Sequence, residues 1–313
     1  MTRDIVRRND GKAWRDEIIA IIILCATLLF GLLISSEGAE FVRSGMLLAV
    51  SCVIPSSFPF MIISDVYAAH GRAEKLHHLG RVFSRVLGIP PSALGAFICG
   101  NVGGFPLGAK MCADAYRENI LSESDAERLI PLSNNPSCAF IIGGVGIGMW
   151  GDVRVGFLLL FSVLSATLIC CFITRGKYIN FDYTNNNTEQ NYNFVESVKR
   201  AGINCIGIIS FISLFCVVCG ILKKRVKNAL ILYPLYSILE VTNAVSAISK
   251  SVDLPPALRL SLCAFSLGFG GVCVGMQSAV FVSGAHLKMR KYYRIKLLEG
   301  VLSASISTLL YKI

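Results

Sequence analysis

The sequence is short of charge. Asp, Glu, Lys and Arg make up only 16% of its 313 residues, while 54% are hydrophobic. Soluble domains average about 25% charged and about 45 to 50% apolar residues. A disordered chain or a coiled coil needs far more charge than this, so both are excluded. The composition instead predicts a membrane protein that crosses the bilayer several times.

Motifs that mark catalytic sites are also absent. The sequence contains no nucleophile elbow, HExxH, Walker motif or GxGxxG placed after a predicted strand. The single acid inside a long apolar stretch, Glu240, has no catalytic partner nearby in the sequence. We therefore expect neither enzymatic activity nor a cofactor.

Cysteine is plentiful, but the pattern of a metal site or of a disulfide framework is missing. Most of the twelve Cys residues lie in long uncharged stretches, where they act as small apolar side chains. Cys216 and Cys219 form a CxxC that lacks a second pair or clustered His residues. We expect no bound metal, and a small secreted scaffold is excluded.

The net charge of +10 raises the question of nucleic-acid binding. However, the basic residues lie between apolar runs, as they do in membrane-protein loops that stay inside the cell. The five basic residues before position 16 place the N-terminus in the cytoplasm. We therefore expect a lipid bilayer around the chain and no nucleic-acid partner.

Long apolar runs define the fold class. Ile18 to Ser36 is uncharged over nineteen residues, enough for a helix of roughly 28 Å to cross the hydrocarbon layer. The predicted fold is all-α and polytopic, with about 7 to 9 membrane segments, some crossing and some re-entrant. The further weakly charged stretches are 44–64, 86–109, 129–151, 155–174, 201–222, 228–249, 260–287 and 297–311.

The stretch 86–109 is too rich in Pro and Gly for one continuous helix. We predict two half-helices around an unwound turn. Unwound backbone is tolerated at membrane depth only where protein surrounds it or where it lines a watery cavity. This stretch is therefore a candidate for part of a binding site.

An internal repeat follows from the same motif. The pattern GGxxxG at Gly103 to Gly108 recurs 167 residues later at Gly270 to Gly275, and each copy is preceded by Pro-Pro. Matched Gly- and Pro-interrupted segments indicate a secondary transporter with its site at the repeat interface, whereas the alternative is close helix packing. We predict that the chain has four parts: an N-terminal basic segment with the first transmembrane helix (1–43), a first repeat (44–174), a polar linker (175–200) and a second repeat (201–313). Each repeat is expected to contain a broken or re-entrant Gly-rich hairpin.

One acid in each half is the candidate for ion coupling. Asp65 follows Pro59 by six residues, and Glu240 follows Pro234 by six. A carboxylate midway along an apolar span costs at least about 2.5 kcal/mol, so Glu240 is expected to face a cavity or a partner. It is a candidate for binding a coupling proton or Na+, with a structural hydrogen bond as the alternative. For Asp65, which lies nearer a span end, an interfacial cap is an equal alternative.

Polar residues at the predicted breaks are candidates for binding substrate. Lys110 is placed to hold an anion beside half-helix N-termini, or to extend to the membrane interface. Asn134 and Asn135 either satisfy freed backbone groups or bind the substrate. The full candidate set is Gly103, Gly104, Phe105, Pro106, Gly108, Lys110, Asn134, Asn135, Thr242, Asn243, Gly270, Gly271, Gly275 and Gln277.

Four motifs resemble the YlbJ family of sporulation integral membrane proteins, which belongs to the Gate-domain, or nucleoside-recognition, group related to concentrative nucleoside transporters. They are PSSFPF at 55–60, GGFPLGAK at 103–110, NNPS at 134–137 and LEVTN at 239–243. The resemblance covers roughly residues 45 to 312, and GGFPLGAK is its most specific element. The second repeat lacks the Phe-Pro and the Lys of that element.

The resemblance implies a transporter of dipicolinate, a planar pyridine dicarboxylate, from the mother cell toward the developing spore. It thereby implies a location in the outer forespore membrane. The other interpretations are a nucleoside or ion permease of the same group, or a non-transporting membrane component that recruits spore-formation proteins. The expected partners are a small anion, a coupling proton or Na+ and lipid, and an oligomer is compatible with the sequence.

Overall fold

The computed structural model describes residues 24, 37–70, 84–175 and 193–311, and every regular element in these ranges is helical. The predicted first transmembrane helix, 18–36, lies outside them except for one residue. Three of the helices have π or 3-10 geometry. In chain order the elements are α2 (Glu37–Leu48), η1 (Ala49–Val53), α3 (Ile54–His70), η3 (Pro91–Ala93), α5 (Leu94–Gly103), α6 (Leu107–Arg117), α7 (Glu123–Ser133), η4 (Phe140–Trp150), α8 (Val153–Ile173), α9 (Phe194–Arg225), α10 (Ala229–Leu239), α11 (Val241–Ser249), α12 (Pro256–Phe269), α13 (Gly271–Gly284) and α14 (Arg290–Tyr311).

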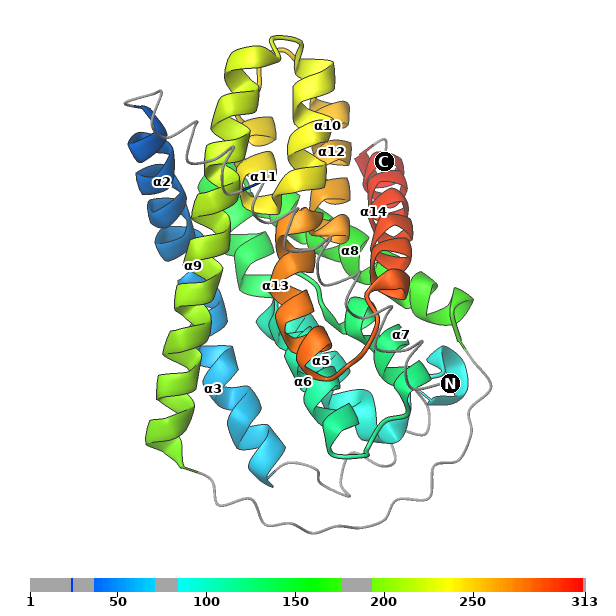
Figure 1. The fold of residues 1–313 in the computed structure, drawn as a ribbon. Coiled ribbons are helices and arrows are strands. Elements are labelled where there is room, and N and C mark those ends of the chain that lie inside the picture. Colours follow the sequence, from blue (N-terminus) through cyan, green and yellow to red (C-terminus); the bar gives the residue numbers. More distant parts are fainter. Residues whose placement is uncertain (1–23, 25–36, 71–83, 176–192, 312–313) are drawn as a thin grey trace, which may run out of the picture.

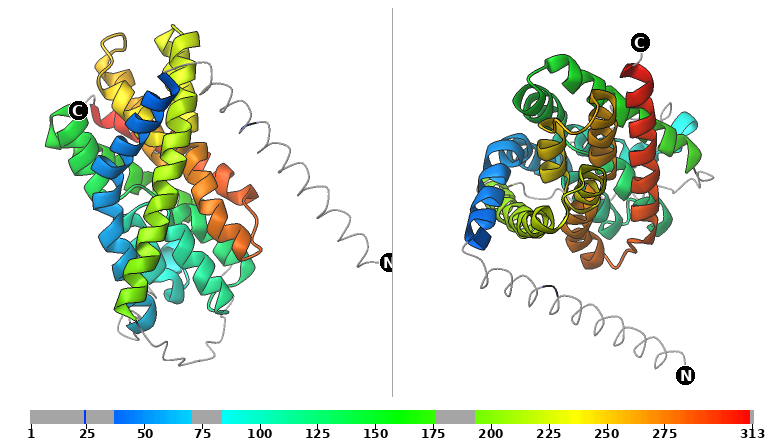
Figure 2. Two further views of the ribbon diagram at one scale, coloured as in Figure 1. Left: turned by 60° about the vertical axis from the view of Figure 1, so that its left-hand side comes forward. Right: turned by 90° about the horizontal axis from the view of Figure 1, so that it is seen from above.

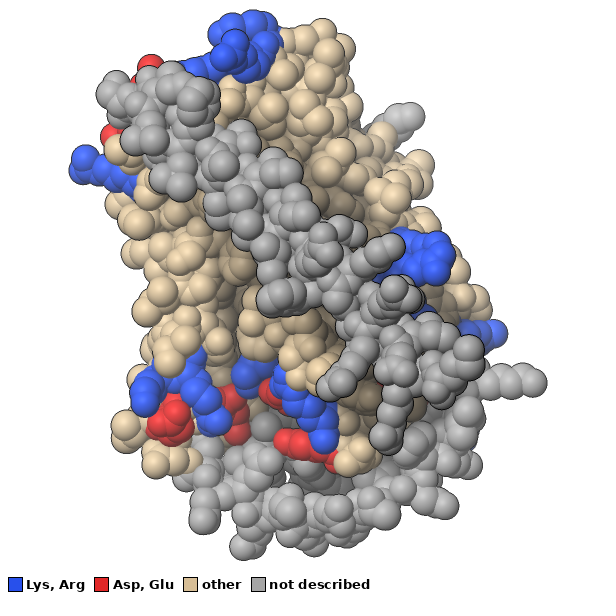
Figure 3. Space-filling view, viewed as in Figure 1, with Lys and Arg blue, Asp and Glu red and all other residues tan. Residues whose placement is uncertain are grey.

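Several of these helices are built to lie in a bilayer. Four helical stretches of the described chain are long and apolar enough to cross a membrane: Glu37–Val66, Val153–Ile173, Phe194–Arg225 and Pro256–Gly284. Large apolar side chains point outward from them, such as Phe157 and Phe161 of α8, whose exposed fractions are 57% and 59%. In Figure 3, charged side chains gather at the top and in the lower part of the view, with further basic groups at the right, while the tan surface visible at the left between them is largely uncharged. The chain is a polytopic integral membrane protein.

The helices form one bundle with its long axis upright in Figure 1. The helices α2, α3 and α9 pack together at one side, and α14 packs with α8 and α12 at the other. The view from above in Figure 2 shows the broken helices α10 to α13 between α9 and α14. These interrupted helices therefore lie in the middle of the bundle.

The first Gly-rich stretch folds as predicted, as two half-helices around a turn. Pro90 precedes the short helix η3, α5 ends at Gly103, and α6 begins at Leu107. The helices α5 and α6 pack against each other, so this stretch is a true hairpin. The next helix, α7, begins at Glu123, where the Ser122 hydroxyl accepts a hydrogen bond from the Asp125 backbone N–H.

The second Gly-rich stretch has a different shape. Pro255 and Pro256 again precede a helix, but α12 and α13 follow one another end to end, with a break of one residue at Gly270. Gly270 has φ 81° and Gly271 has φ 80°, a region that glycine adopts without strain. Because this break lacks the three-residue turn formed by Gly104, Phe105 and Pro106, α13 continues onward and does not fold back.

The predicted division into four parts stays a prediction. Helix α2 begins at Glu37 and runs across the proposed boundary at 43. Of the predicted linker 175–200, residues 176–192 lie outside the described chain, and α9 begins at Phe194 with Asn193 as its N-cap. A polar sequence at the start of a membrane helix is consistent with a helix that projects beyond the bilayer.

Candidate functional site

Four helix breaks meet inside the bundle. The tip of the α5–α6 hairpin touches the break between α7 and η4, since a Cβ added to Gly104 would lie 2.8 Å from Ser137 N. The Phe105 ring lies against Gly270, at 3.3 Å from an added Cβ. Gly271 approaches Leu239 O at 3.0 Å by the same measure, beside the break between α10 and α11. Segments far apart in the sequence thus bring their unwound backbone to one place.

A pocket lies where the breaks meet. It holds about 380 Å³ free of protein atoms, including its open mouth. Both halves of the chain contribute. Besides the segments at the breaks, η1 and α3 of the first half and α9 of the second half line it. The lining residues are Val53, Ser56, Ser57, Phe105, Pro136, Ser137, Phe140, Ile208, Ile212, Glu240, Val241, Thr242, Val274 and Gln277.

Glu240 sits in the pocket wall as the N-cap of α11. Its side chain is buried, and its Oε1 accepts a hydrogen bond from Thr242 N at 2.9 Å. Its Oε2 accepts from Asn243 N at 2.6 Å and from Asn243 Nδ2 at 2.8 Å. The carboxylate therefore stabilises the exposed N–H groups of a broken helix, and it also faces the cavity.

Close backbone contact holds the hairpin in position. A Cβ on Gly108 would lie 1.8 Å from Ser133 O, so the start of α6 lies directly against the end of α7. No side chain larger than hydrogen fits there without movement of one helix. This contact fixes Phe105 at the hairpin tip relative to the residues that follow Ser133.

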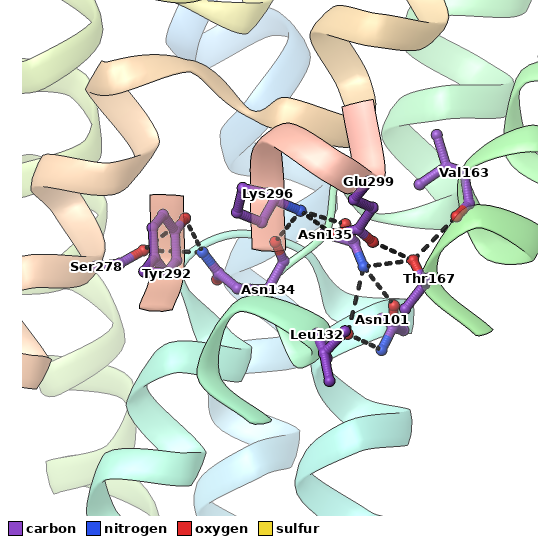
Figure 4. Close-up of polar contacts among 10 residues, drawn as sticks. All are labelled: Asn101, Leu132, Asn134, Asn135, Val163, Thr167, Ser278, Tyr292, Lys296 and Glu299. Atoms are coloured by element: carbon purple, nitrogen blue, oxygen red, sulfur yellow. Dashed lines mark hydrogen bonds and ion pairs between the residues drawn. The ribbon is translucent and has the colours of Figure 1, made fainter. Parts of the chain in front are cut away.

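Asn134 and Asn135 follow α7 and connect the two halves of the chain (Figure 4). Asn134 Nδ2 donates to Ser278 Oγ at 2.8 Å and to Tyr292 Oη at 2.9 Å. Asn135 Nδ2 donates to Asn101 Oδ1 at 2.8 Å. The two amide groups thus donate hydrogen bonds to side chains on three other helices, α13, α14 and α5. Asn134 Oδ1 is buried and accepts no hydrogen bond from the described residues, an acceptor left free for a water molecule or a ligand.

An ion pair on α14 completes this network. Lys296 and Glu299 lie one helical turn apart, and both side chains are completely buried. Lys296 Nζ donates to Glu299 Oε2 at 2.8 Å, to Asn135 Oδ1 at 2.7 Å and to Asn134 O at 3.1 Å. The other carboxylate oxygen contacts Thr167 Oγ1 on α8. All three protons of the ammonium group have acceptors.

Lys110 and Asp65 lie together, but outside the pocket wall. Lys110 Nζ is 2.9 Å from Asp65 Oδ1 and 3.4 Å from Asp114 Oδ2. Arg200 approaches Asp65 Oδ2 at 3.2 Å. These residues form a partly buried charge network, in which two acids already occupy the Lys110 ammonium.

The structure thus separates the predicted site residues into groups. Phe105, Glu240, Thr242 and Gln277 line the pocket, and Asn243 binds Glu240. The remaining predicted residues do not line the pocket. Two of them lie at other helix contacts, Gly103 beside Phe60 and Gly275 beside Tyr293. The others lie at or next to the helix breaks: Gly104, Pro106, Gly108, Gly270, Gly271, Asn134 and Asn135.

Sequence reasoning missed Thr167, Lys296 and Glu299. Lys296 closes a run of basic residues from Lys288 onward, and this run has the composition of an exposed loop. The structure instead makes it part of α14 and turns Lys296 inward, while Arg294 stays exposed. A signal was present: Lys296 and Glu299 share one helix face with Gly300, Ser303 and Ser307, small residues suited to burial.

In the described part of the chain, no group of three or more His, Cys, Asp or Glu side chains is placed to hold a metal ion. Cys216 and Cys219 of the CxxC lie buried on α9 with free thiols. Cys216 Sγ contacts Asn243 Oδ1 at 3.4 Å, so this thiol supports the residue that binds Glu240.

Comparison with known proteins finds a similar curated protein. No family model matches the sequence, and no solved structure matches it. The chain is 26% identical over 314 aligned positions to the sporulation integral membrane protein YlbJ of Bacillus subtilis strain 168, an alignment that covers 86% of this chain and 76% of that protein. The chain is thus similar to a sporulation integral membrane protein, in agreement with the resemblance that the sequence motifs indicated.

Proposed function

We propose that this protein is a secondary transporter of a small carboxylated heteroaromatic solute during spore formation, with dipicolinate as the first candidate. The observation that carries the proposal is the meeting of four helix breaks at a pocket whose wall contains the buried carboxylate of Glu240. Irregular backbone at the centre of a membrane bundle is characteristic of transporter binding sites.

The helix ends at the pocket favour an anionic solute. Helices α6 and α13 both begin beside it, and neither has a side-chain cap on its first N–H groups. Val274 and Gln277 of α13 line the pocket directly. Free N–H groups and the positive end of the helix dipole stabilise carboxylates. A coupling proton or Na+ at Glu240 offsets the repulsion between its carboxylate and the solute.

The pocket wall also suits a flat ring. Phe105 and Phe140 line it from two different breaks, and aromatic side chains stack against planar heteroaromatic rings. Hydroxyl groups of Ser56, Ser57 and Ser137 add hydrogen-bonding groups. The proposal places the protein in the outer forespore membrane with its N-terminus in the cytoplasm.

The test is uptake of dipicolinate into proteoliposomes that contain the purified full chain, with uridine as the comparison solute. A proton gradient and a Na+ gradient are imposed in separate experiments. We expect uptake of dipicolinate above that of empty vesicles, driven by one of the gradients. Uptake of uridine alone would favour a nucleoside permease, and uptake of neither by folded protein would favour a non-transporting component that recruits other proteins.

Two substitutions separate the roles of Glu240. Glu240→Gln removes the charge and keeps one amide oxygen as an acceptor, whereas Glu240→Ser removes the charge and keeps only a short hydroxyl acceptor for the N-terminus of α11. If ion coupling requires the carboxylate, both variants fold and both lose gradient-driven uptake. Normal uptake by Glu240→Ser would show that Glu240 serves only as a helix cap.

A further inference from the structure

The ion pair of Lys296 and Glu299 is not explained by stability. Both side chains have an exposed fraction of 0%, and the removal of two charges from water opposes folding unless the pair and its hydrogen bonds compensate for it. Apolar side chains of similar volume at such positions are often as stable or more stable. Buried ionisable residues in membrane helices commonly mark paths for substrates or protons.

The pair lies directly behind the pocket. The Phe105 ring lines the pocket, and Lys296 Nζ lies 5.9 Å from its centroid. The ammonium also binds Asn134 O and Asn135 Oδ1 (Figure 4), and these residues directly precede Pro136 and Ser137 of the pocket wall. Movement of one aromatic side chain at a hairpin tip would therefore open the pocket to a cation.

The network can accept a proton at Glu299. The Thr167 hydroxyl carries one hydrogen and has two acceptors in reach, Glu299 Oε1 and Val163 O, the latter at 2.9 Å. It donates to Glu299 while that side chain is an ionised carboxylate. When Glu299 takes up a proton, the hydroxyl can turn to Val163 O, and its oxygen, which also accepts from Asn135 Nδ2 at 3.0 Å, can then accept from the protonated acid. The neutral form of Glu299 has a partner already in position.

Resting on the proposed transport function, we propose that Lys296 exchanges the carboxylate of Glu299 for a carboxylate of the solute, and that Glu299 takes up one proton in the same step. The proton comes from water on the side from which the solute enters. Before the exchange, Lys296 and Glu299 sum to zero charge. Afterwards the ammonium and the bound solute carboxylate do so, and Glu299 is neutral.

The exchange makes proton uptake obligatory. Without it, two carboxylates would share one ammonium in a region without bulk water, where like charges repel strongly. The titratable groups that act on Glu299 from the packed helices are Cys170 and Cys171 of α8 and Tyr292 of α14; thiols and phenols of this kind are neutral at pH 7. The buried charged residues of α7 and the arginine of α12 bind elsewhere: Glu127 to Lys291, Arg128 to Gly88 O, and Arg259 to Ile248 O and Ser249 O.

The experiment measures dipicolinate affinity of the purified full chain against pH, over the range in which the free solute is fully ionised. Linkage to one proton changes the apparent affinity by up to about tenfold per pH unit, with tighter binding at lower pH. In Glu299→Gln, which imitates the protonated acid, we expect binding to persist and its dependence on Glu299 protonation to disappear. An unchanged pH dependence in this variant overturns the proposal.

A second variant keeps the test decisive if Glu299→Gln does not fold. The double substitution Lys296→Met with Glu299→Leu replaces the pair by apolar side chains and is expected to fold but not to bind dipicolinate. Lys224→Met is the matched control, because this lysine lies on the half-exposed end of α9 and pairs with Glu37. Normal binding by the double variant overturns the proposal. Absence of dipicolinate binding in the unaltered protein would instead contradict the proposed function.

Discussion

The contact between α6 and α7 leads to a sharp prediction for Gly108→Ala. The added Cβ would lie 1.8 Å from Ser133 O and 2.4 Å from Ser133 C. A normal carbon-to-oxygen contact is about 3.3 to 3.6 Å, so the two helices must separate by more than about 1 Å. Overpacking of a tight core costs about 1 to 3 kcal/mol, and an overlap this deep belongs at the upper limit or beyond.

The measurement is thermal unfolding of the purified protein in detergent. A loss of about 3 kcal/mol lowers the midpoint by roughly 6 to 12 °C in a domain of about 150 to 250 residues. Gly207→Ala is the matched control, because a Cβ at Gly207 on α9 meets nothing within 4 Å; alanine there should leave the midpoint unchanged or raise it slightly. A midpoint for Gly108→Ala within about 2 °C of the unaltered protein, where 1 kcal/mol already corresponds to about 2 to 4 °C, would refute the close approach of α6 to α7.

Further predictions concern single contacts. Ser122→Ala removes the N-cap of α7 and should cost about 1 kcal/mol in unfolding free energy; an unchanged value would mean that the start of α7 is not stabilised by its cap. Gly271→Ala should destabilise the protein more than Gly151→Ala, because both have positive φ but only Gly271 meets backbone, at Leu239 O; equal thermal midpoints would contradict this. Tyr292→Phe removes one acceptor from a buried amide and should cost about 1 kcal/mol or more, measured by the same unfolding assay, whereas no loss would mean that water replaces the phenol.

Local chemistry made part of the fold predictable. Pro and Gly interrupt helices through their own backbone properties, so the half-helices on either side of Gly104 follow from the sequence. The cap at Ser122 follows for the same reason. These features depend on neighbours within a few residues, and a single sequence contains that information.

The shape of each break was not predictable in the same way. Both copies of GGxxxG interrupt a helix, yet α5 and α6 fold back while α12 and α13 run end to end. The difference lies in the residues after the glycine pair, Phe105-Pro106 in the first copy and Val272-Cys273 in the second. Only the first pair contains a proline, which removes a backbone donor and lengthens the interruption.

The polar network required knowledge of distant contacts. Asn134 lies 158 residues before Tyr292, and Asn135 lies 161 residues before Lys296. No local pattern connects these positions. Reading Lys296 as one more residue of a basic loop ignored the helical periodicity of α14, which separates it from the exposed Arg294.

The pocket wall has a consequence for how such a protein can be assembled. Phe105, Pro136 and Phe140 come from before residue 176, while Glu240 and Gln277 come from after residue 192. Neither half of the polypeptide possesses the complete pocket by itself. Two separately synthesised halves would have to meet in the bilayer before the pocket exists, and a chain truncated after α8 would lack the part of its wall that Glu240 and Gln277 form.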